Sequence, residues 1–308
     1  MNEHFYAVIM AGGGGTRLWP LSRQNRPKQM LRLVSNRSLF QMATDRLEGL
    51  FPADHIYVVT VADQATELQK QSPNIPAENY ILEPMPRGTA SVVGLAAVVL
   101  QKRDPQAVMA VLTADHFIEN VAGFQQILIS ADQLAQRGYL VTLGIQPSFP
   151  STGYGYIQRG EPLDESSQQD GFRVVKFKEK PNEELASEML RRGDHLWNSG
   201  MFIWRVDRIQ EEFRRQMPEL ARILDQIAAS WSTAWQTETL KKLWPQIKPQ
   251  TIDYGIMEHA EHVAVLPGAG LGWSDVGSWD SLFDVLPVGV GIAEVTKEGL
   301  VVPVIRNA

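Results

Sequence analysis

The sequence predicts an α/β fold in which a mostly parallel, mixed β-sheet is flanked by helices. Two observations support this prediction: short apolar segments rich in β-branched residues recur through the first half of the chain, and helical patterns separate them. Near-continuous apolar strands that alternate with helices are typical of a parallel sheet covered on both faces. With 308 residues, the chain is long enough for one large domain of this class.

The expected strands and helices follow one another in a regular order. In the first half, strands are expected at residues 7–11, 56–61, 80–82, 107–112 and 139–144, and helices at 39–50, 64–71, 90–103 and 124–136. In the second half, strands are expected at 154–159, 172–177 and 196–206, and helices at 183–192, over most of 207–245 and at 278–286. A polar loop at 164–170 and a strand-like tail from residue 287 complete the arrangement. Ligands of such sheets bind beyond the carboxyl ends of the strands.

The composition argues against several classes of protein. A net charge of −6 argues against a general nucleic-acid-binding surface. The chain has no cysteine, which rules out disulfides and cysteine–metal sites and fits a reducing compartment. The longest apolar run, near Val92–Leu100, is too short to span a bilayer, and the first residues do not resemble a signal peptide. We therefore expect a cytoplasmic protein that acts on neither nucleic acid nor membranes.

The loop that follows the first strand has the composition of a phosphate-binding site. Four consecutive glycines, Gly12–Gly15, leave the backbone N–H groups able to close on a phosphate chain. Arg17 and Lys28 add positive charge close by. The dinucleotide motif G-x-G-x-x-G does not fit, because its third glycine position holds Leu18, and the chain contains no Gly-Lys pair for a P-loop. The sequence therefore predicts a binding loop for a triphosphate that belongs to neither common class.

Two aspartates are candidates to hold a divalent metal ion. Asp115 comes just after the strand expected at 107–112, and Asp275 lies in the glycine-flanked segment 272–277. Magnesium takes one or two protein carboxylates and fills its other positions with water and phosphate oxygens. For each aspartate the alternative is an N-cap of the helix that follows, and the residues alone leave both readings open.

Several motifs together resemble the sugar-1-phosphate nucleotidylyltransferases. They are G-G-x-G-T-R-L-x-P-L in the glycine loop with the Pro27-Lys28 pair after it, F-x-E-K-P at Phe177–Pro181, and Asn198-Ser199-Gly200. The segment Leu82–Ala90 resembles the mannose-1-phosphate guanylyltransferases within that family more closely than the thymidylyl- or adenylyl-transferring members. The resemblance runs from about residue 6 to residue 283. It implies a Rossmann-like fold of the nucleotide-diphospho-sugar transferase type with a sugar-binding subregion, a catalytic domain at 1–285 and a short β-like tail at 286–308.

The resemblance also implies a role for each matching residue. The nucleotide would be bound by Ala11, Gly12, Gly13, Gly15, Thr16, Arg17, Lys28, Glu83, Arg87, Gly88, Thr89 and Asp115. The sugar would be bound by Gly155, Glu179, Lys180, Asn198 and Ser199. Mg²⁺ would be held by Asp115 and Asp275, and the catalytic cations would be Arg17, Lys28 and Lys180.

The activity that this resemblance implies is the transfer of GMP from GTP to α-D-mannose 1-phosphate, which gives GDP-mannose and pyrophosphate. The sugar phosphate would attack the α-phosphorus directly and in line, with the help of Mg²⁺ and without a general base, because a phosphate monoester is mostly dianionic at neutral pH. Two alternatives stay open. One is a nucleotidylyltransferase for another sugar 1-phosphate, and the other is a catalytically silent regulatory protein that binds GDP-mannose. A homodimer is a possible assembly.

Overall fold

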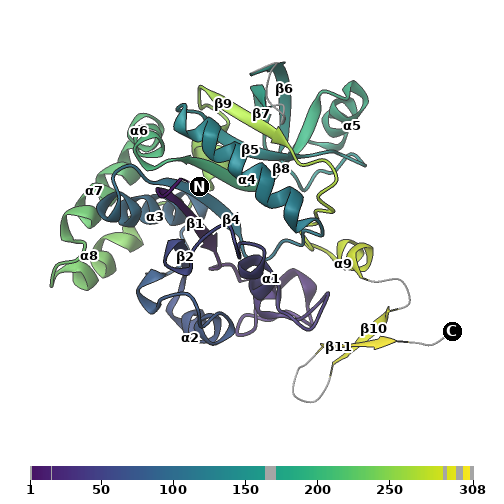
Figure 1. Cartoon of the computed structure of the whole chain (residues 1–308), viewed down its shortest axis with the longest axis horizontal. Coiled ribbons are helices and arrows are strands. Elements are labelled where there is room, and N and C mark those ends of the chain that lie inside the picture. The colour runs from purple at the N-terminus through teal and green to yellow at the C-terminus, as the bar shows by residue number, and fades with distance from the viewer. Residues whose placement is uncertain (1, 15, 164–170, 287–289, 296–300, 306–308) are drawn as a thin grey trace.

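A nine-stranded mixed sheet forms the centre of the molecule, with strand order β3-β2-β1-β4-β8-β5-β9-β7-β6 (Figure 1). The computed structural model describes residues 2–14, 16–163, 171–286, 290–295 and 301–305. The strands of the sheet are β1 (Phe5–Met10), β2 (Ile56–Val61), β3 (Tyr80–Glu83), β4 (Val108–Thr113), β5 (Leu140–Ile145), β6 (Tyr156–Pro162), β7 (Phe172–Lys178), β8 (His195–Arg205) and β9 (Val263–Pro267).

Parallel pairing of β1 with its neighbours sets the position of the glycine loop. β1 lies between β2 and β4 and runs parallel to both, with Met10 opposite Thr113 of β4. The Ala114 N–H donates to the Met10 carbonyl at 3.3 Å, just beyond the two strands. The chain segments that follow β1 and β4 therefore leave the sheet side by side, at the edge where ligands of such folds bind.

The long strand β8 makes the sheet mixed. It lies between β4 and β5 and runs antiparallel to both of them. β5 pairs in parallel with β9, whereas β6 and β7 form an antiparallel pair at the far edge. The mixed sheet flanked by helices confirms the predicted fold class, and β8 is the strand that separates the two parallel parts.

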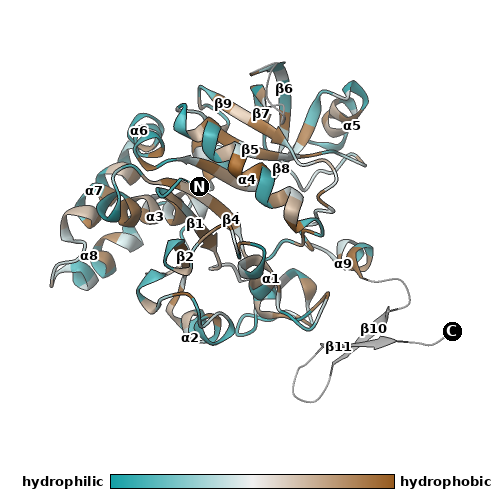
Figure 2. Ribbon diagram, in the orientation of Figure 1, coloured by the Kyte–Doolittle hydropathy of each residue, from teal (hydrophilic) through white to brown (hydrophobic). Residues whose placement is uncertain are grey.

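Helices cover both faces of the sheet. One face carries α3 (Thr89–Arg103), α6 (Val206–Gln216), α7 (Pro218–Ser230) and α8 (Gln236–Leu243). The other carries α1 (Leu39–Asp45), α2 (Ala62–Gln71), α4 (Val121–Gln136) and α5 (Glu183–Arg192). Within β1, Tyr6 and Val8 join the first hydrophobic cluster while Ala7 and Ile9 join the second. This explains the unbroken apolar sequence of the strand: both its faces are buried. Figure 2 shows the hydrophobic colour along the central strands and hydrophilic colour on outer helix faces.

A third hydrophobic cluster ties the end of the sheet domain to its beginning. The short helix α9 (Trp279–Val285) contributes Leu282, which is buried together with Leu18, Leu31 and Leu39 from the N-terminal region. Ser278 caps α9 by accepting from the Ser281 N–H. The loop that carries Asp275 is therefore fixed against the segment that follows the glycine loop.

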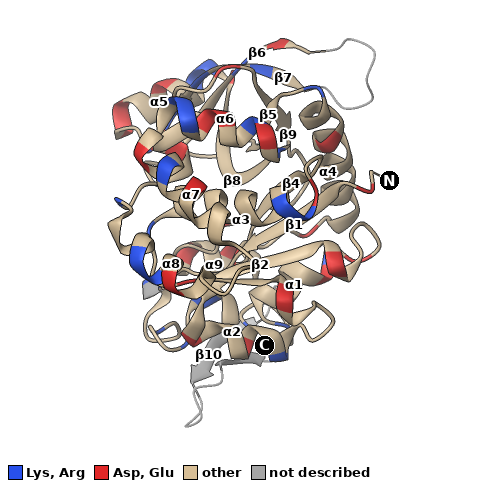
Figure 3. Ribbon diagram, turned by 90° about the vertical axis from the view of Figure 1, so that its left-hand side faces the viewer, with Lys and Arg blue, Asp and Glu red and all other residues tan. Residues whose placement is uncertain are grey.

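Three further features complete the described structure. The strands β10 (Val290–Val295) and β11 (Val301–Ile305) pair antiparallel with each other. Figure 3 shows the charged residues mostly on helices and loops, while β1 and β2 carry none. None of the helices in the described part of the chain is both long and apolar enough to cross a membrane.

Most element boundaries agree with the predictions, and one helix is shorter than expected. The helix predicted at 39–50 ends at Asp45. Two turns follow it, in which the N–H groups of Leu47 and Glu48 donate to the carbonyls of Thr44 and Asp45. The chain then reaches Gly49, whose φ is +80°. The loop predicted at 164–170 lies outside the described residues. The division between a domain at 1–285 and a tail at 286–308 stays a prediction.

Candidate active site

Hydrogen bonds from the side chain of Gln29 fix the backbone of the glycine loop. The Gln29 side-chain amide donates to the carbonyls of Ala11 and Gly13, both at 3.1 Å, and to Oε1 of Gln64 at 3.0 Å. The loop carbonyls therefore point toward Gln29. A Cβ atom at Gly13 or Gly14 would meet no atom within 4 Å, so the space beside the backbone of these two glycines is open. Gly15 and the Thr16 side chain lie outside the described part, so their predicted roles are not placed.

Gly12 is the glycine whose missing side chain matters for packing. A Cβ at this position would lie 2.6 Å from Oε1 of Glu83, the last residue of β3. Glu83 is 2% exposed, and within the described residues its Oε2 has no hydrogen-bond partner. Burial raises the pKa of this carboxyl to about 7. The structure thus places a buried, partly unpaired carboxyl group directly beside the glycine loop.

The two candidate metal ligands meet at the carboxyl edge of β4. Phe117 and Ser274 form an isolated antiparallel bridge, with reciprocal backbone hydrogen bonds of 2.9 and 3.0 Å. Neither aspartate caps a helix, because Asn120 caps α4 and Ser278 caps α9. The N-cap alternative is thereby excluded for both Asp115 and Asp275.

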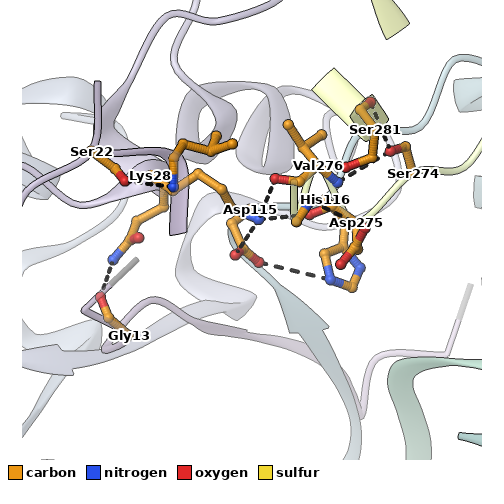
Figure 4. Close-up of polar contacts among 12 residues, drawn as sticks. Gly13, Ser22, Lys28, Asp115, His116, Ser274, Asp275, Val276 and Ser281 are labelled. Carbon is orange, nitrogen blue, oxygen red and sulfur yellow. Dashed lines mark hydrogen bonds and ion pairs between the residues drawn. The ribbon is translucent and has the colours of Figure 1, made fainter. Parts of the chain in front are cut away.

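Lys28 connects the N-terminal region to both aspartate segments (Figure 4). Its Nζ lies 2.8 Å from Oδ2 of Asp115. It also donates to the backbone carbonyls of Asp275 at 2.6 Å and Val276 at 3.3 Å. Burial opposes the charged form of Asp115, but the positive charges of Lys28 and Arg17 outweigh it and lower the pKa of this carboxyl. The carboxylate form that a metal ion requires is therefore stabilised before any ligand binds.

Tyr154 orients the second aspartate, and this contact could not be predicted from the motifs. The Tyr154 hydroxyl donates to Oδ1 of Asp275 at 2.8 Å, and the Gly277 N–H donates to the same oxygen at 3.1 Å. Burial, together with the Asp275 charge, raises the pKa of Tyr154. Since Oδ1 carries both hydrogen bonds, Oδ2 of Asp275 is the oxygen left for a metal ion.

His116 is a second residue that the sequence reasoning did not single out. The Trp273 indole N–H donates to its Nδ1 at 3.2 Å, and the two rings meet edge to face. Burial lowers the pKa of His116 to about 4. The ring is therefore neutral, and its contact with Trp273 braces the Asp115 segment against the Asp275 loop.

The nucleotide-binding residues predicted at Arg87, Gly88 and Thr89 lie at the start of helix α3, close to the helix start expected at residue 90. Gly88 is the N-cap with φ +84°, and a Cβ there would lie 2.2 Å from the Gln250 carbonyl. The Arg87 guanidinium donates to the Pro245 carbonyl at 2.8 Å, and the Thr89 hydroxyl accepts from the Ile252 N–H at 2.9 Å. These side chains hold the 245–252 segment in place, and their roles in nucleotide binding stay predictions.

A second buried carboxyl group lies among the residues predicted to bind the sugar. A Cβ at Gly155 would lie 2.3 Å from Oε2 of Glu179, and within the described residues this oxygen has no hydrogen-bond partner. Burial, and then the nearby Asp253, raise the pKa of Glu179 to about 7. Lys180 lies 3.4 Å from the other Glu179 oxygen, is 54% exposed and has φ +43°. Gly155, Glu179 and Lys180 are therefore brought together, as the sequence predicts.

Asn198 is oriented by a partner that the motifs did not reveal. Its amide nitrogen donates to Oδ1 of Asp253 at 2.7 Å, and its oxygen accepts from the Gly200 N–H at 3.0 Å. Ser199 is 1% exposed, and its hydroxyl accepts from the Met201 N–H at 3.3 Å. Asp253 begins a π-helical turn, Asp253–Met257. No local pattern of the sequence pairs Asp253 with Asn198, which lies 55 residues away.

A cavity of about 1020 Å³ opens beside the glycine loop. Ligand pockets commonly measure about 300–1,000 Å³, so this cavity has room for a nucleotide. Its lining includes Gly12, Gly14, Trp19, Gln64, Pro84 and Met85. Trp19 is 71% exposed and forms part of its wall.

The donor groups present fit a magnesium ion. Lys28 shows that the space between Asp115 and the Asp275 loop already attracts a cation. The carboxylate oxygens here are hard ligands of the kind that Mg²⁺ prefers. No group of three or more His, Cys, Asp and Glu side chains placed to hold a metal ion occurs among the described residues. A metal bound by two carboxylates would take its remaining ligands from phosphate and water.

Comparison with known proteins shows the family of this chain. The Nucleotidyl transferase family profile matches residues 6–288. Mannose-1-phosphate guanylyltransferase 2 from Escherichia coli O157:H7 is 40% identical over 291 residues, which cover 91% of this chain and 59% of that protein. A mannose-1-phosphate guanylyltransferase from Klebsiella pneumoniae is 39% identical over 290 residues, with the same coverage. The chain thus spans about three fifths of the length of these relatives.

A solved structure shares the fold. A protein from Thermus thermophilus, described as a mannose-1-phosphate geranyltransferase, superposes with a TM-score of 0.82 at 34% identity. The superposition covers 92% of this chain and 79% of that one. Sequence profile, relatives and structure agree with one another: this chain belongs to the nucleotidyl transferase family.

Proposed function

We propose that the chain transfers GMP from GTP to α-D-mannose 1-phosphate, which gives GDP-mannose and pyrophosphate. The names of its relatives support this activity. The observation that carries the proposal is the convergence of Lys28, Asp115 and the Asp275 loop beside the glycine loop, at the carboxyl edge of β1 and β4. That edge brings a glycine-rich backbone, fixed cations and two carboxylates together, which supports binding of a nucleoside triphosphate with a metal ion.

The chemistry needs charge neutralisation more than proton transfer. The sugar phosphate is already mostly dianionic at neutral pH, because its second pKa is about 6. The barrier arises because two anions must meet, so positioned cations are the main requirement. We assign Arg17 to the β- and γ-phosphates, Lys28 to the α-phosphate and Lys180 to the sugar phosphate. Arg17 and Lys180 are both exposed, so a ligand can reach them.

Asp115 and Asp275 are the residues that would hold Mg²⁺. When bound, the ion would supply positive charge to the phosphate oxygens. Tyr154 and Gly277 fix one oxygen of Asp275, and Lys28 keeps Asp115 ionised. These contacts prepare the two carboxylates for a cation without large rearrangement.

Glu83 supports guanine as the base. Guanine presents two adjacent donors, N1–H and the N2 amino group, and a carboxylate can accept from both. Adenine has an acceptor at N1 and cannot make this pair of contacts. The buried Oε2 of Glu83, without a partner among the described residues, lies beside the glycine loop where such donors would satisfy it.

Glu179 and Asn198 would form hydrogen bonds with the sugar hydroxyls. Glu179 has an unpaired oxygen within the described structure, and Asp253 fixes the orientation of Asn198. A carboxyl group and an oriented amide are suitable partners for neighbouring hydroxyl groups. A homodimer, a cytoplasmic location and the absence of nucleic-acid and membrane partners stay predictions from the sequence.

A pyrophosphate-release assay over a matrix of nucleoside triphosphates and sugar 1-phosphates tests this function. We expect release with GTP and mannose 1-phosphate in the presence of Mg²⁺. A preference for ATP or dTTP would overturn the guanine assignment, and release with another sugar 1-phosphate alone would overturn the mannose assignment. Binding of GDP-mannose without release from any pair would indicate a silent regulatory protein. Glu83→Gln should reduce the preference for GTP over ATP, because an amide cannot accept both guanine donors.

A further inference from the structure

The Lys28 ammonium has no hydrogen-bond donor left for a phosphate. An ammonium group carries three N–H donors and no acceptor. Three oxygens surround Nζ: Oδ2 of Asp115 at 2.8 Å and the carbonyls of Asp275 at 2.6 Å and Val276 at 3.3 Å. The side chain is 3% exposed, so water does not compete for these contacts. Lys28 can reach a nucleotide only by giving up a partner that it holds in the present arrangement.

The partner most easily replaced is Asp115. Its contact with Lys28 is an ion pair, and a divalent cation attracts the same carboxylate more strongly than a single charge does. The Asp275 carboxylate is not involved, because Lys28 contacts the backbone carbonyl of that residue and not its side chain. An incoming metal ion would therefore find one oriented carboxylate at Asp275 and one occupied by lysine at Asp115 (Figure 4).

We propose that Lys28 is the resident cation of the metal site in the ligand-free protein, and that a divalent metal displaces its ammonium from Asp115 and so releases it to the nucleotide. This inference rests on the proposed function for the nucleotide step, but the exchange at Asp115 concerns the protein and the metal alone. The order that it implies is specific. The metal binds weakly on its own, and tightly once nucleotide phosphates accept the displaced ammonium.

The backbone around Lys28 is built for a movement of the side chain alone. Lys28 begins the 3-10 turn Lys28–Met30, whose C-cap N–H donates back to the Lys28 carbonyl. The next residue, Gln29, is 4% exposed and tied to the glycine loop through Ala11 and Gly13. A flexible four-carbon chain on this fixed backbone can move its charge from Asp115 toward the same loop.

Binding of Mn²⁺ to the full chain without nucleotide or sugar tests the exchange, with electron paramagnetic resonance used to measure the free ion. Lys28→Met should bind Mn²⁺ at least about tenfold more tightly than the wild type, because the competing charge is gone. The matched control is Lys180→Met, which removes another lysine paired with a carboxylate and should leave Mn²⁺ affinity unchanged. Adding Asp115→Asn to Lys28→Met should abolish the gain.

The proposal is overturned if Lys28→Met binds Mn²⁺ no more tightly than the wild type. It is also overturned if Lys180→Met shows the same gain, which would mean that only the overall charge matters. Should Lys28→Met fail to fold, Lys28→Gln keeps a donor for the carbonyls and serves in its place. For either variant, Mn²⁺ should raise the melting temperature more than it does for the wild type. None of these measurements uses GTP or a sugar phosphate, so they can succeed even if the proposed activity fails.

Discussion

The hydroxyl of Tyr154 donates a 2.8 Å hydrogen bond to Oδ1 of Asp275, across 121 residues of sequence. The next residue, Gly155, borders Glu179 at the candidate sugar site, and its carbonyl accepts from the Asn198 N–H at 2.8 Å. The Tyr154-Gly155 pair thus contacts the candidate metal ligand Asp275 with a side chain and the candidate sugar-binding residues Glu179 and Asn198 with its backbone. The Asp275 segment and the F-x-E-K-P motif are separate motifs in the sequence, and the Tyr154-Gly155 pair contacts both of them in the structure.

Removing the Tyr154 hydroxyl should weaken metal binding. In Tyr154→Phe the ring stays but Asp275 loses a hydrogen bond to a charged group, which is worth about 1.5–3 kcal/mol. The Mg²⁺ concentration for half-maximal pyrophosphate release should therefore rise by about tenfold or more. The control is Tyr6→Phe, which also removes a tyrosine–aspartate contact, with Asp104 at 3.1 Å, away from this edge of the sheet. An equal change in both variants would contradict the positioning role.

Replacing Arg17 by alanine should lower turnover strongly while the protein stays folded. Loss of one group that stabilises transition-state charge costs about 3–4 kcal/mol, so kcat should fall by about a hundredfold or more. The comparison is Arg32→Ala, a second exposed arginine nearby that has no assigned role. Near-normal turnover of a folded Arg17→Ala protein would contradict the assignment to the leaving phosphates.

Adding a methyl group at Gly155 should damage the sugar side of the reaction. The Cβ of Gly155→Ala would lie 2.3 Å from Oε2 of Glu179, so the carboxyl group must move. Displacement of a positioned group by about 1 Å can cost up to about a hundredfold in rate, and the KM for sugar 1-phosphate should rise with it. Gly153→Ala is the matched control, because its Cβ would meet Ser151 at an ordinary 3.6 Å. Unchanged kinetics in Gly155→Ala would remove Glu179 from the sugar site.

As the pH rises from about 4.5 to about 7, the free energy of unfolding should fall, in part because of Glu83. Burial raises the pKa of this group from 4.5 to about 7 in the folded state. In that interval the unfolded chain has released the proton while the folded protein still holds it, so the unfolded state binds fewer protons and unfolding becomes easier as pH rises.

Urea unfolding at several pH values across this interval measures the effect. Glu83→Gln should show a smaller loss of unfolding free energy than the wild type, whereas a change at the exposed Glu188 should leave the loss unaltered. An identical pH dependence in Glu83→Gln and the wild type would show that Glu83 titrates normally in the folded protein.

The sequence predicted the parts of this structure that depend on short stretches of chain. The strand before the glycine loop, the helix expected at 90–103 and the helical region within 207–245 follow from local patterns. The grouping of Asp115 with Asp275 followed from the family resemblance, and the lysine between them now supports it.

Other features depend on contacts between distant segments and could not be predicted. β8 inserts between β4 and β5, although a long stretch of chain that includes β6, β7 and α5 separates it from β5, and no local pattern specifies that neighbour. The same holds for Tyr154, whose partner is a loop far downstream, and for Asp253, whose partner Asn198 lies in β8. Such pairings become visible only when the chain is folded.

The most direct measurement of the central claim uses GTP with sulfur at one position of the α-phosphate, in a single diastereomer. Incubated with mannose 1-phosphate and Mg²⁺, the protein should form the matching thio-analogue of GDP-mannose with inverted configuration at phosphorus, because one in-line displacement inverts it. Retention would indicate two displacements through a covalent intermediate, and no product with a folded protein would contradict the proposed transfer itself.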